Sequence, residues 1–587
     1  MMKIVILFIS CMCVHASQKR QQYITTTAGI PVAHTNPPNQ GGGGGGGGYQ
    51  PYPPFGQPPP LNPNSIHFVG AGYNLLKGNP DGEFWDKAGD DPGLLMTRKV
   101  LHVSQGNNPV ELEIEHRDAC QTSHEYNLIY NEKSYQQRLM EAISTSGSAD
   151  ASLRQYAFTL SEGYKSIKTQ TNNLHYVFQD YTTLCNIGHA RFKIHLARSD
   201  HLSVNREFAA SVCQLPTTYN QSQYMNFIDE WGTHMITEVE IGKKMIMRYA
   251  ARRNSYFSFL MNYTNPDVSK GGPLAGFPES LELDIGTFKY RSAYRTLVGT
   301  FHDQLGTGNT YMHDEVELVL ATIESALNPD LWTYLPVFVS QRVCPQSIQS
   351  GLSVIRSNLV RALTEYPIYK GAQAPVDTPL AIPIVWPYGT YGLLKSKSGC
   401  PGQLTWSEGS RAQSTSVSFG NRQPHSDVTV GSGIVSVNFC MKERAFESEF
   451  SLFWPKGDYC IYKYSNCPFG FKNGSVYFSE AKGSSIGVLP DGMYRNDTTY
   501  GVCCRNDGHY LTEIYLPTSK PFYLFKNQHG CQHVQGMLVQ EETITLSSDG
   551  AVNGAHPSID LKTSSDQTTL HFCYYSKPPS SNGGVIG

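Results

Sequence analysis

An imperfect alternation of apolar and polar residues runs from Met245 to Tyr263. The apolar members fall on odd positions and include Met245, Met247, Tyr249, Phe257, Phe259 and Met261. A period of two is typical of a β-strand with one apolar face. The run, although broken at Arg253 and Ser255, exceeds most soluble strands and could cross a bilayer as a tilted strand. An edge strand of an ordinary sheet has the same pattern, so both interpretations stay open.

Other segments favour helices or no fixed structure. An apolar stripe with helical spacing predicts a helix after Pro345: Ile348, Leu352, Ile355, Leu359 and Leu363. We expect a second helix over about Asp314 to Leu327. Residues 135–170 are rich in Ser, Ala and Gly, which suits either a surface loop or a segment that is helical in one state and extended in another.

The N-terminal residues do not predict a folded core. Lys3 followed by an apolar stretch from Ile4 to Val14 is typical of a signal peptide, which we place at residues 1–17. Residues 18–65 contain eight consecutive glycines and a proline-rich run, a composition that predicts a disordered leader. Export would place the protein outside the cell or in the lumen of a vesicle or phagosome.

Composition and charge narrow the class of protein. Charged residues make up 16 % of the chain and the net charge is −3, so no basic field predicts a nucleic-acid partner. No nucleophile elbow, zinc-protease motif or phosphate loop occurs, and we therefore expect no enzyme and no cofactor or metal site.

Cysteine usage favours an oxidising compartment. Fourteen cysteines become twelve (14 − 2) once Cys11 and Cys13 leave with the signal peptide, and an even number predicts a disulfide set without specifying its connectivity. The candidates are Cys120, Cys185, Cys213, Cys344, Cys400, Cys440, Cys460, Cys467, Cys503, Cys504, Cys531 and Cys573. Glycosylation motifs at Asn220, Asn262, Asn473 and Asn496 agree with secretion.

The last third of the chain contains an internal repeat. The pattern W-P-x-G-x-Y begins at Trp386 and again at Trp454, and the spacing continues to Lys395 and Lys463. Pro and Gly set turns while Trp and Tyr fill strand cores, so we expect duplicated β-units joined by disulfides. Repetition of the two tryptophans favours core packing over sugar binding.

Trp231 to Gly242, which reads WGTHMITEVEIG, resembles the signature of the membrane attack complex/perforin (MACPF) superfamily. The match consists of Trp231, Gly232, Thr233, His234 and Gly242. Met235 and Lys243 depart from it, and the single glycine resembles the macrophage-expressed perforin branch. The resemblance implies a bent, twisted antiparallel sheet flanked by helical clusters that unfurl into membrane-inserting hairpins. Met245 to Met261 would then belong to an inserting strand, and the signature to a bend rather than to a catalytic site.

The C-terminal region resembles the C-terminal domain of apextrins. The similarity rests on FWPKGDYCIYKYSNCPFGF from Phe453, LPDGMY from Leu489, and the vicinal cysteines Cys503 and Cys504. Such domains are associated with extracellular matrix and innate immunity, and some bind bacterial cell-wall components. The resemblance therefore implies a mainly-β, disulfide-rich domain that could bind cell-wall glycans.

These inferences combine into one expected architecture of the α+β class. We expect a MACPF domain at 66–370, a linker at 371–384, an apextrin-like domain at 385–576 and a flexible tail at 577–587. The implied function is a secreted, defensive or toxic pore-forming protein whose partners are lipid membranes and copies of itself in a ring. The alternatives are a non-lytic surface-binding MACPF protein and an extracellular matrix protein.

Overall fold

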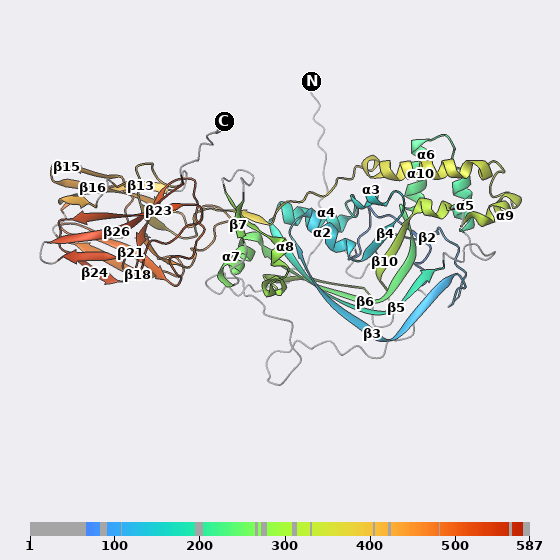
Figure 1. The fold of residues 1–587 in the computed structure, drawn as a ribbon, viewed down its shortest axis with the longest axis horizontal. Coiled ribbons are helices and arrows are strands. Elements are labelled where there is room, and N and C mark those ends of the chain that lie inside the picture. Colours follow the sequence, from blue (N-terminus) through green and yellow to red (C-terminus); the bar gives the residue numbers. More distant parts are fainter. Residues whose placement is uncertain are drawn as a thin grey trace, which may run out of the picture.

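The computed structural model describes residues 66–82, 91–106, 108–193, 204–263, 268–271, 279–307, 314–328, 331–402, 406–420, 424–479, 482–562 and 566–578. The expected signal peptide and leader lie outside these residues. The molecule is elongated, with a mixed helix-and-sheet body formed by the N-terminal part and a β-sheet body formed by the C-terminal part (Figure 1).

The N-terminal body is built on an eight-stranded sheet in the order β2-β1-β6-β10-β4, with β5 and β9 also pairing with β6, and β3 pairing with β5. Its strands are β1 (Ala71–Tyr73), β2 (Leu94–Lys99), β3 (Leu112–Ile129), β4 (Ile143–Ser146), β5 (Tyr176–Phe192), β6 (His234–Arg252), β9 (Thr300–Thr307) and β10 (Asp314–Thr322). All pairings are antiparallel except that of β4 with β10. The long strands β3, β5 and β6 sweep in an arc below α2 and α4 (Figure 1).

Helices pack on this sheet and at one end of it. They are α2 (Glu132–Met140), α3 (Asp150–Arg154), α4 (Glu162–Asn172), α5 (Arg206–Cys213), α6 (Gln221–Trp231), α7 (Arg253–Tyr263), α8 (Ile285–Phe288), α9 (Leu335–Ser340) and α10 (Ile348–Tyr369), with short 3-10 turns at Ser292–Arg295, Ile323–Leu327 and Trp332–Tyr334. Four members of the predicted stripe of α10 are buried and Leu352 is partly buried, which confirms that helix. Pro345 lies just before it, because the helix begins at Ile348.

Two of the predicted elements were wrong. Asp314 to Thr322 is the strand β10, and only the following five residues form a 3-10 turn. The single strand expected over 245–263 ends at Arg252, and its second half is helix α7. In both places pairing and packing with distant parts of the chain override local periodicity.

The expected linker also contains structure. Its residues Ala381–Pro383 form β11, which pairs with β8 (Ser280–Leu283), and β8 in turn pairs with β7 (Val268–Gly271).

The C-terminal body is all β and confirms the expected mainly-β domain. Its sheet follows the order β14-β23-β26-β22-β17-β12-β16-β13-β19, with further strands paired alongside. The strands are β12 (Tyr391–Leu394), β13 (Trp406–Ser414), β14 (Val417–Phe419), β15 (Val428–Gly431), β16 (Ile434–Lys442), β17 (Asp458–Lys463), β18 (Lys472–Phe478), β19 (Gly483–Gly487), β20 (Gly492–Tyr494), β21 (Thr498–Asn506), β22 (Phe522–Lys526), β23 (Leu538–Leu546), β24 (Gly550–Gly554), β25 (Ile559–Lys562) and β26 (Gln567–Ser576).

The internal repeat forms matching turns in this body. Tyr391 donates its hydroxyl hydrogen bond to the Pro387 carbonyl at 3.1 Å, and Tyr459 donates to Pro455 at 2.5 Å. A third copy, without the tryptophan, runs from Pro490 to Tyr494, whose hydroxyl donates to the Pro490 carbonyl at 2.6 Å. Trp386 and Trp454 are 1 % and 2 % exposed, which confirms their place in the core.

All twelve predicted cysteines are paired. The bonds are Cys120–Cys185, Cys213–Cys344, Cys400–Cys440, Cys460–Cys504, Cys467–Cys503 and Cys531–Cys573. The vicinal Cys503 and Cys504 therefore bond to two different partners. No helix in the described residues has the length and apolarity needed to cross a membrane.

Candidate functional site

The bend of the N-terminal sheet coincides with irregularities on neighbouring strands. The register shifts between His116 and Gln121 on β3, and between Asn186 and Gly188 where β5 pairs with β6. A third shift lies between Glu315 and Glu317 on β10, whose Asp314 pairs with Gly242 of β6. Bulges bend strands and increase their twist. Aligned bulges therefore explain the arc without any proline.

Gly242 lies in this row because a side chain would not fit there. A Cβ atom on Gly242 would come within 1.9 Å of the Cys185 carbonyl oxygen, which is backbone and cannot rotate away.

We expect Gly242→Ala to separate β5 from β6 and to lower the free energy of unfolding by about 1–3 kcal/mol, the range of overpacked sites. Chemical denaturation measures it. Gly431→Ala is the matched control, because open space surrounds a Cβ at that position, and an equal effect of both substitutions would contradict the steric argument.

The other signature residues lie at the start of β6, away from the bend. Trp231 is 1 % exposed and packs edge-on against Phe208, with ring centroids 5.3 Å apart. Gly232 has a φ of 90° beside the backbone of Tyr73, where a Cβ atom would be 2.6 Å from the carbonyl oxygen. The Thr233 amide donates to that same carbonyl at 2.9 Å. These residues anchor β6 to β1 and to the helices, and only Gly242 reaches the bend.

His234 is a buried link between the sheet and the helical segment. Its Nδ1 lies 2.8 Å from the Thr233 hydroxyl, and its Nε2 lies 3.7 Å from a carboxylate oxygen of Asp150 on α3. Burial lowers the pKa of His234, and attraction to Asp150 and Glu324 does not restore it. The imidazole is therefore neutral in the folded protein at pH 7.

Acidification should destabilise the fold through His234. The unfolded chain takes up a proton at this histidine near pH ~6.5, whereas the folded protein does so only at lower pH. The stability that depends on a neutral His234 is therefore fully present above about pH 6.5. As the pH falls toward the pKa of His234 in the folded protein, the free energy of unfolding decreases by at most about 1.4 kcal/mol for each pH unit. We expect His234→Gln to reduce the loss of thermal stability between pH 7 and pH 5, measured by calorimetry. Parallel pH profiles of the two proteins would contradict this prediction.

Two helical segments interrupt hairpins of the bent sheet. The first contains α2, β4, α3 and α4, and it connects β3 to β5, which pair along their length. The second contains α7, β7, β8 and α8, and it connects β6 to β9, which also pair. Because the flanking strands of each segment are already neighbours, each segment could extend its hairpin without new partners for those strands.

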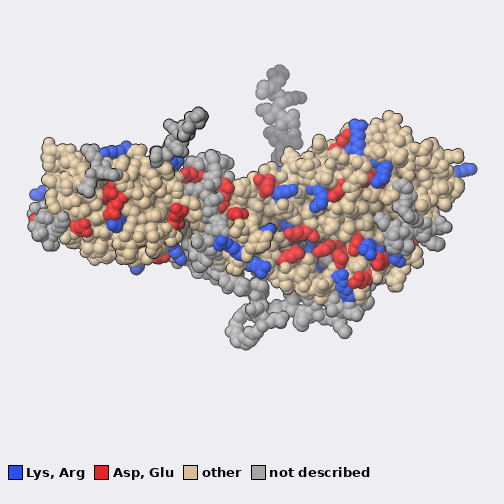
Figure 2. All heavy atoms as spheres, viewed as in Figure 1, with Lys and Arg blue, Asp and Glu red and all other residues tan. Residues whose placement is uncertain are grey.

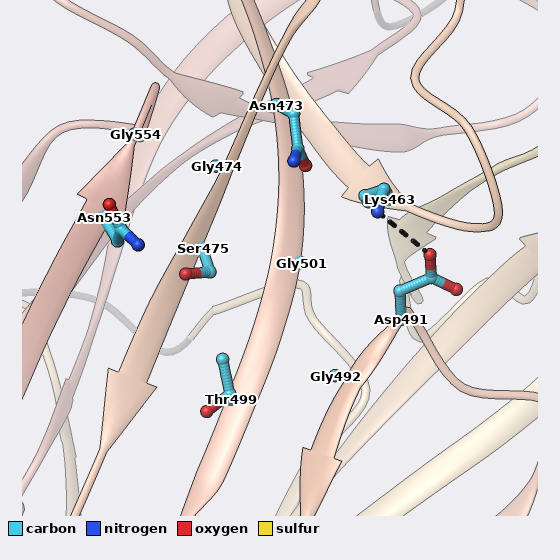
Figure 3. Close-up of a pocket in the computed structure, with 10 residues that line it drawn as sticks. All are labelled: Lys463, Asn473, Gly474, Ser475, Asp491, Gly492, Thr499, Gly501, Asn553 and Gly554. Atoms are coloured by element: carbon cyan, nitrogen blue, oxygen red, sulfur yellow. Dashed lines mark ion pairs between the residues drawn. The ribbon is translucent and has the colours of Figure 1, made fainter.

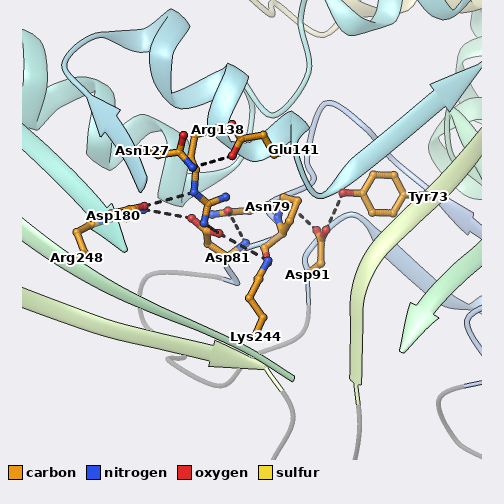
Figure 4. Close-up of polar contacts among 11 residues, drawn as sticks. Tyr73, Asn79, Asp81, Asp91, Asn127, Arg138, Glu141, Asp180, Lys244 and Arg248 are labelled. Atoms are coloured by element: carbon orange, nitrogen blue, oxygen red, sulfur yellow. Dashed lines mark hydrogen bonds and ion pairs between the residues drawn. The ribbon is translucent and has the colours of Figure 1, made fainter. Parts of the chain in front are cut away.

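A buried ion network fastens the first segment to the sheet (Figure 4). Arg138 of α2 contacts Asp81 at 3.0 Å and Asp180 of β5 at 3.5 Å. Arg248 of β6 contacts Asp180 at 2.6 Å and Asp81 at 3.2 Å, and Lys244 lies 3.9 Å from Asp81. All five side chains are at most 6 % exposed. This network is therefore one of the polar attachments of the first segment to the sheet, beside the contact between Asp150 and His234.

Electrostatics favour the charged form of this network. Burial by itself raises the pKa of Asp81, but the Arg138, Lys244 and Arg248 cations outweigh it and the pKa lies below its usual range. Nearby, burial raises the pKa of Asp91 although Tyr73 donates to its carboxylate at 2.7 Å. Sequence reasoning missed this network. Its one signal was the pair of cations at the even positions Lys244 and Arg248.

The predicted inserting residues divide between two environments. Met245, Met247 and Tyr249 lie on the half-buried face of β6, whereas Ile246, Arg248 and Ala250 on the opposite face are buried. The burial is therefore the reverse of the expectation, because the polar face of the strand holds the ion network. Phe257 and Phe259 of α7 are buried, and Met261 is half-buried. Membrane insertion by these residues stays a prediction.

The C-terminal body covers the second segment. Phe450, Leu452 and Tyr515 pack against the hydrophobic cluster that contains Phe257 and Leu260 of α7. The Thr518 amide donates to Glu279 at 3.1 Å, and the linker strand β11 pairs with β8 of the segment. Any unfurling of this segment must break these contacts.

A polar pocket lies on the C-terminal body, between β17, β18, β21 and β24 (Figure 3). Its volume is about 310 Å³, and its lining consists of Lys463, Asn473, Gly474, Ser475, Asp491, Gly492, Thr499, Gly501, Asn553 and Gly554. Lys463 pairs with Asp491 at 3.4 Å. Glycines expose backbone groups to a ligand, and the amide, hydroxyl and charged groups suit a polyhydroxylated molecule.

One group of side chains in the described residues has the geometry to hold a metal ion. Ligand atoms of His189, Glu238 and Glu240 lie within 4.8 Å of one another on β5 and β6. The Asn186 side chain also donates to Glu240, and His189 lies 3.7 Å from Glu115. All three groups are half-buried, and His189 and Glu240 have protein partners, so the arrangement does not require an ion.

The predicted glycosylation sites differ in position. Asn220 caps α6 by accepting from the Gln223 amide at 3.3 Å, and it is exposed like Asn473 and Asn496. Asn262 lies in α7, so a glycan there would belong to the second helical segment.

Lys, Arg, Asp and Glu side chains are interspersed over the visible face of both bodies (Figure 2), in agreement with the net charge of −3.

Each of the two bodies matches a known protein family. Residues 56–273 match the model of the MAC/Perforin domain, and residues 386–575 match the C-terminal domain of apextrin. The first range includes the signature, the whole first segment and the α7 and β7 part of the second, and the other range includes the three turn repeats. The resemblance to the macrophage-expressed branch stays a prediction.

Solved structures similar to the chain share little sequence with it. GNIP1Aa from Chromobacterium piscinae is 10 % identical over 82 % of this chain and 88 % of its own, with a TM-score of 0.30. A protein with a MAC/Perforin domain from Bacteroides thetaiotaomicron is 8 % identical over 59 % and 68 %, with a TM-score of 0.28. Astrotactin-2, a vertebrate perforin-like membrane protein, is 9 % identical over 87 % and 72 %, with a TM-score of 0.23. The chain therefore contains a region that matches the MAC/Perforin domain, residues 56–273, followed by a region that matches the C-terminal domain of apextrin, residues 386–575.

Proposed function

We propose that this protein forms pores: it is exported, assembles into rings on target membranes and inserts both helical segments as amphipathic β-hairpins. The observation that carries the proposal is the position of these segments, each between two strands that already pair. Each half of residues 132–172 exceeds the ~9–11 residues that a tilted transmembrane strand needs. A closed barrel from many copies would leave no unpaired backbone in lipid.

The proposed chemistry is mechanical and requires no enzyme. Asp180 and Arg248 are cross-strand partners in the register of β5 and β6, so their ion pair can survive extension of the hairpins. The contacts of Arg138 to Asp81 and Asp180 cannot survive, because α2 belongs to the segment that leaves. Insertion is thus a switch between two packed states, driven by new burial of apolar surface in lipid.

The proposed role of the C-terminal domain is recognition of microbial or cell surfaces. Support comes from its polar pocket, whose groups suit carbohydrate hydroxyls, and from its position at the opposite end of the elongated molecule from α9 and α10 (Figure 1). Its disulfides are typical of a domain that works in an oxidising environment. Contact with α7 would let binding at a surface influence the second segment.

Dye release from liposomes tests the proposal. Purified protein is added to vesicles of neutral and anionic composition, between pH 5 and pH 7.5, with and without bacterial cell-wall fragments. We expect leakage and ring-shaped assemblies in electron micrographs under at least one condition. Rings that lie on intact bilayers without leakage would refute pore formation and favour a non-lytic, surface-binding scaffold.

A further inference from the structure

A second cavity lies where the C-terminal body meets α7 and the linker. Its volume is about 450 Å³, and it opens between α7, the residues around β11 and two loops of the C-terminal body. The apolar lining consists of Met261, Leu281, Pro383, Ile384, Val385, Pro387, Phe450, Leu452, Phe453, Trp454, Pro455, Ile514 and Tyr515. We propose that this cavity binds a single-chain lipid with a zwitterionic phosphodiester headgroup.

The walls select a hydrocarbon chain. Four polar residues complete the lining, namely Ser258, Lys456, Thr512 and Glu513. Leu281, Trp454 and Ile514 are buried, whereas Lys456, Thr512 and Glu513 are exposed. The interior is therefore apolar and the mouth is polar. The volume falls within the ~300–1,000 Å³ typical of small-molecule sites, which are common at domain interfaces.

The mouth selects the headgroup. Lys456 and Glu513 both line the cavity, yet they form no ion pair with each other, and neither has a salt-bridge partner within the described part of the chain. A cation and an anion held apart at one opening complement a phosphate and an ammonium group on one ligand. A fatty acid would meet Glu513 with a like charge, and a cationic amphiphile would meet Lys456.

The site is separate from pore formation, so each can fail alone. Met261 and Ser258 come from α7, and Leu452 and Ile514 come from the C-terminal body. A ligand that occupies the cavity must therefore stabilise the docked arrangement of the two bodies relative to a separated one. Binding is measured on the full chain in the absence of membranes, whatever the protein does to liposomes.

Calorimetric titration with lysophosphatidylcholines below their micelle concentration tests the site. We expect one molecule bound per chain, with affinity rising about fourfold for each added methylene, as burial of ~0.8 kcal/mol per group implies, until the chain fills the cavity. A raised melting temperature should accompany binding. Affinity that stays flat with chain length, or the absence of saturable binding, would overturn the proposal.

Variants locate the ligand. Met261→Trp fills the cavity and should weaken binding at least tenfold, as should Leu452→Trp from the opposite wall. Val354→Trp adds the same bulk at an exposed position of α10 and should bind normally. Calorimetry first shows that each variant retains the wild-type melting profile. Normal binding by both wall variants, or equal loss in the Val354 variant, would refute the location.

Charge reversal tests the headgroup. Lys456→Glu should weaken binding of the zwitterionic lipid about tenfold and Glu513→Lys should favour an anionic lysophosphatidylglycerol, whereas Lys472→Glu on exposed β18 should change neither. Replacing both residues, with Lys456→Glu and Glu513→Lys together, should restore part of the lost affinity. Indifference to all these changes would overturn the assignment of the headgroup.

Discussion

Arg248→Met should lower the free energy of unfolding of the N-terminal body by about 3–5 kcal/mol, the cost of breaking a buried ion pair. Arg248 donates to Asp180 from Nε at 2.7 Å and from Nη2 at 2.6 Å, and it also contacts Asp81. Methionine conserves most of the side-chain volume but leaves Asp180 to the longer contact with Arg138. Asp180 is fully buried, so water cannot replace the lost donors. Urea denaturation of the full chain measures the change.

Two further variants separate this effect from the loss of an arginine in general. Arg361→Met removes an exposed ion pair with Glu365. Because surface ion pairs contribute little, we expect this substitution to lower the free energy of unfolding by less than ~1 kcal/mol. Combining Arg248→Met with Asp180→Leu removes both charges and should be less destabilising than Arg248→Met alone, since no carboxylate is then left without its partner. If Arg248→Met and Arg361→Met shift stability equally, the buried ion pair contributes no more to folding than a surface pair.

Much of the architecture was predictable because it rests on local or strongly specific patterns. The stripe from Ile348 to Leu363 predicted α10, since an amphipathic helix needs only one apolar face. The repeat predicted duplicated turns because proline and glycine act through their own backbone conformations. The signature at Trp231 predicted the bent sheet by resemblance. A count of cysteines predicted a disulfide set, although pairing depends on distances that no spacing reveals.

The errors come from interactions between distant residues. Asp314 to Thr322 is a strand because β6 and β4 pair with it on both sides. The run after Met245 changes from strand to helix at Arg253, whose side chain donates to the carbonyl oxygens of Tyr130 and Thr171. The buried face of β6 carries Lys244 and Arg248 because Asp81 and Asp180 converge there from elsewhere. Periodicity alone assigns such cations to solvent.

The two helical segments are restrained by different means. Buried ions and the pairing of β4 with β10 hold the first, while the linker strand and the C-terminal body hold the second. Under the proposed mechanism, a signal received by the C-terminal domain acts mainly on the second segment, because its contact with the first is confined to the end of that segment, where Glu449 lies 3.9 Å from His175. Under the proposed mechanism, release of the first segment requires a separate event, such as contact with a neighbouring copy. This asymmetry makes the first segment the better place for an artificial lock.

A disulfide between β4 and β10 should abolish leakage and reduction should restore it. Ser144 and Val319 are paired positions on these neighbouring strands, and Ser144 is exposed. Paired strands lie ~4.7–4.9 Å apart, within the range that a disulfide spans. Ser144→Cys with Val319→Cys thus ties the first segment to the frame. We expect oxidised protein to retain less than about a tenth of wild-type dye release, because each hairpin must leave the frame before it can enter lipid.

Ser410→Cys with Ser436→Cys, whose hydroxyls lie 2.7 Å apart on β13 and β16, adds a matched disulfide that spans no moving part and controls for effects of the reductant. Full leakage by the oxidised β4–β10 variant would show that the first segment stays folded while pores form.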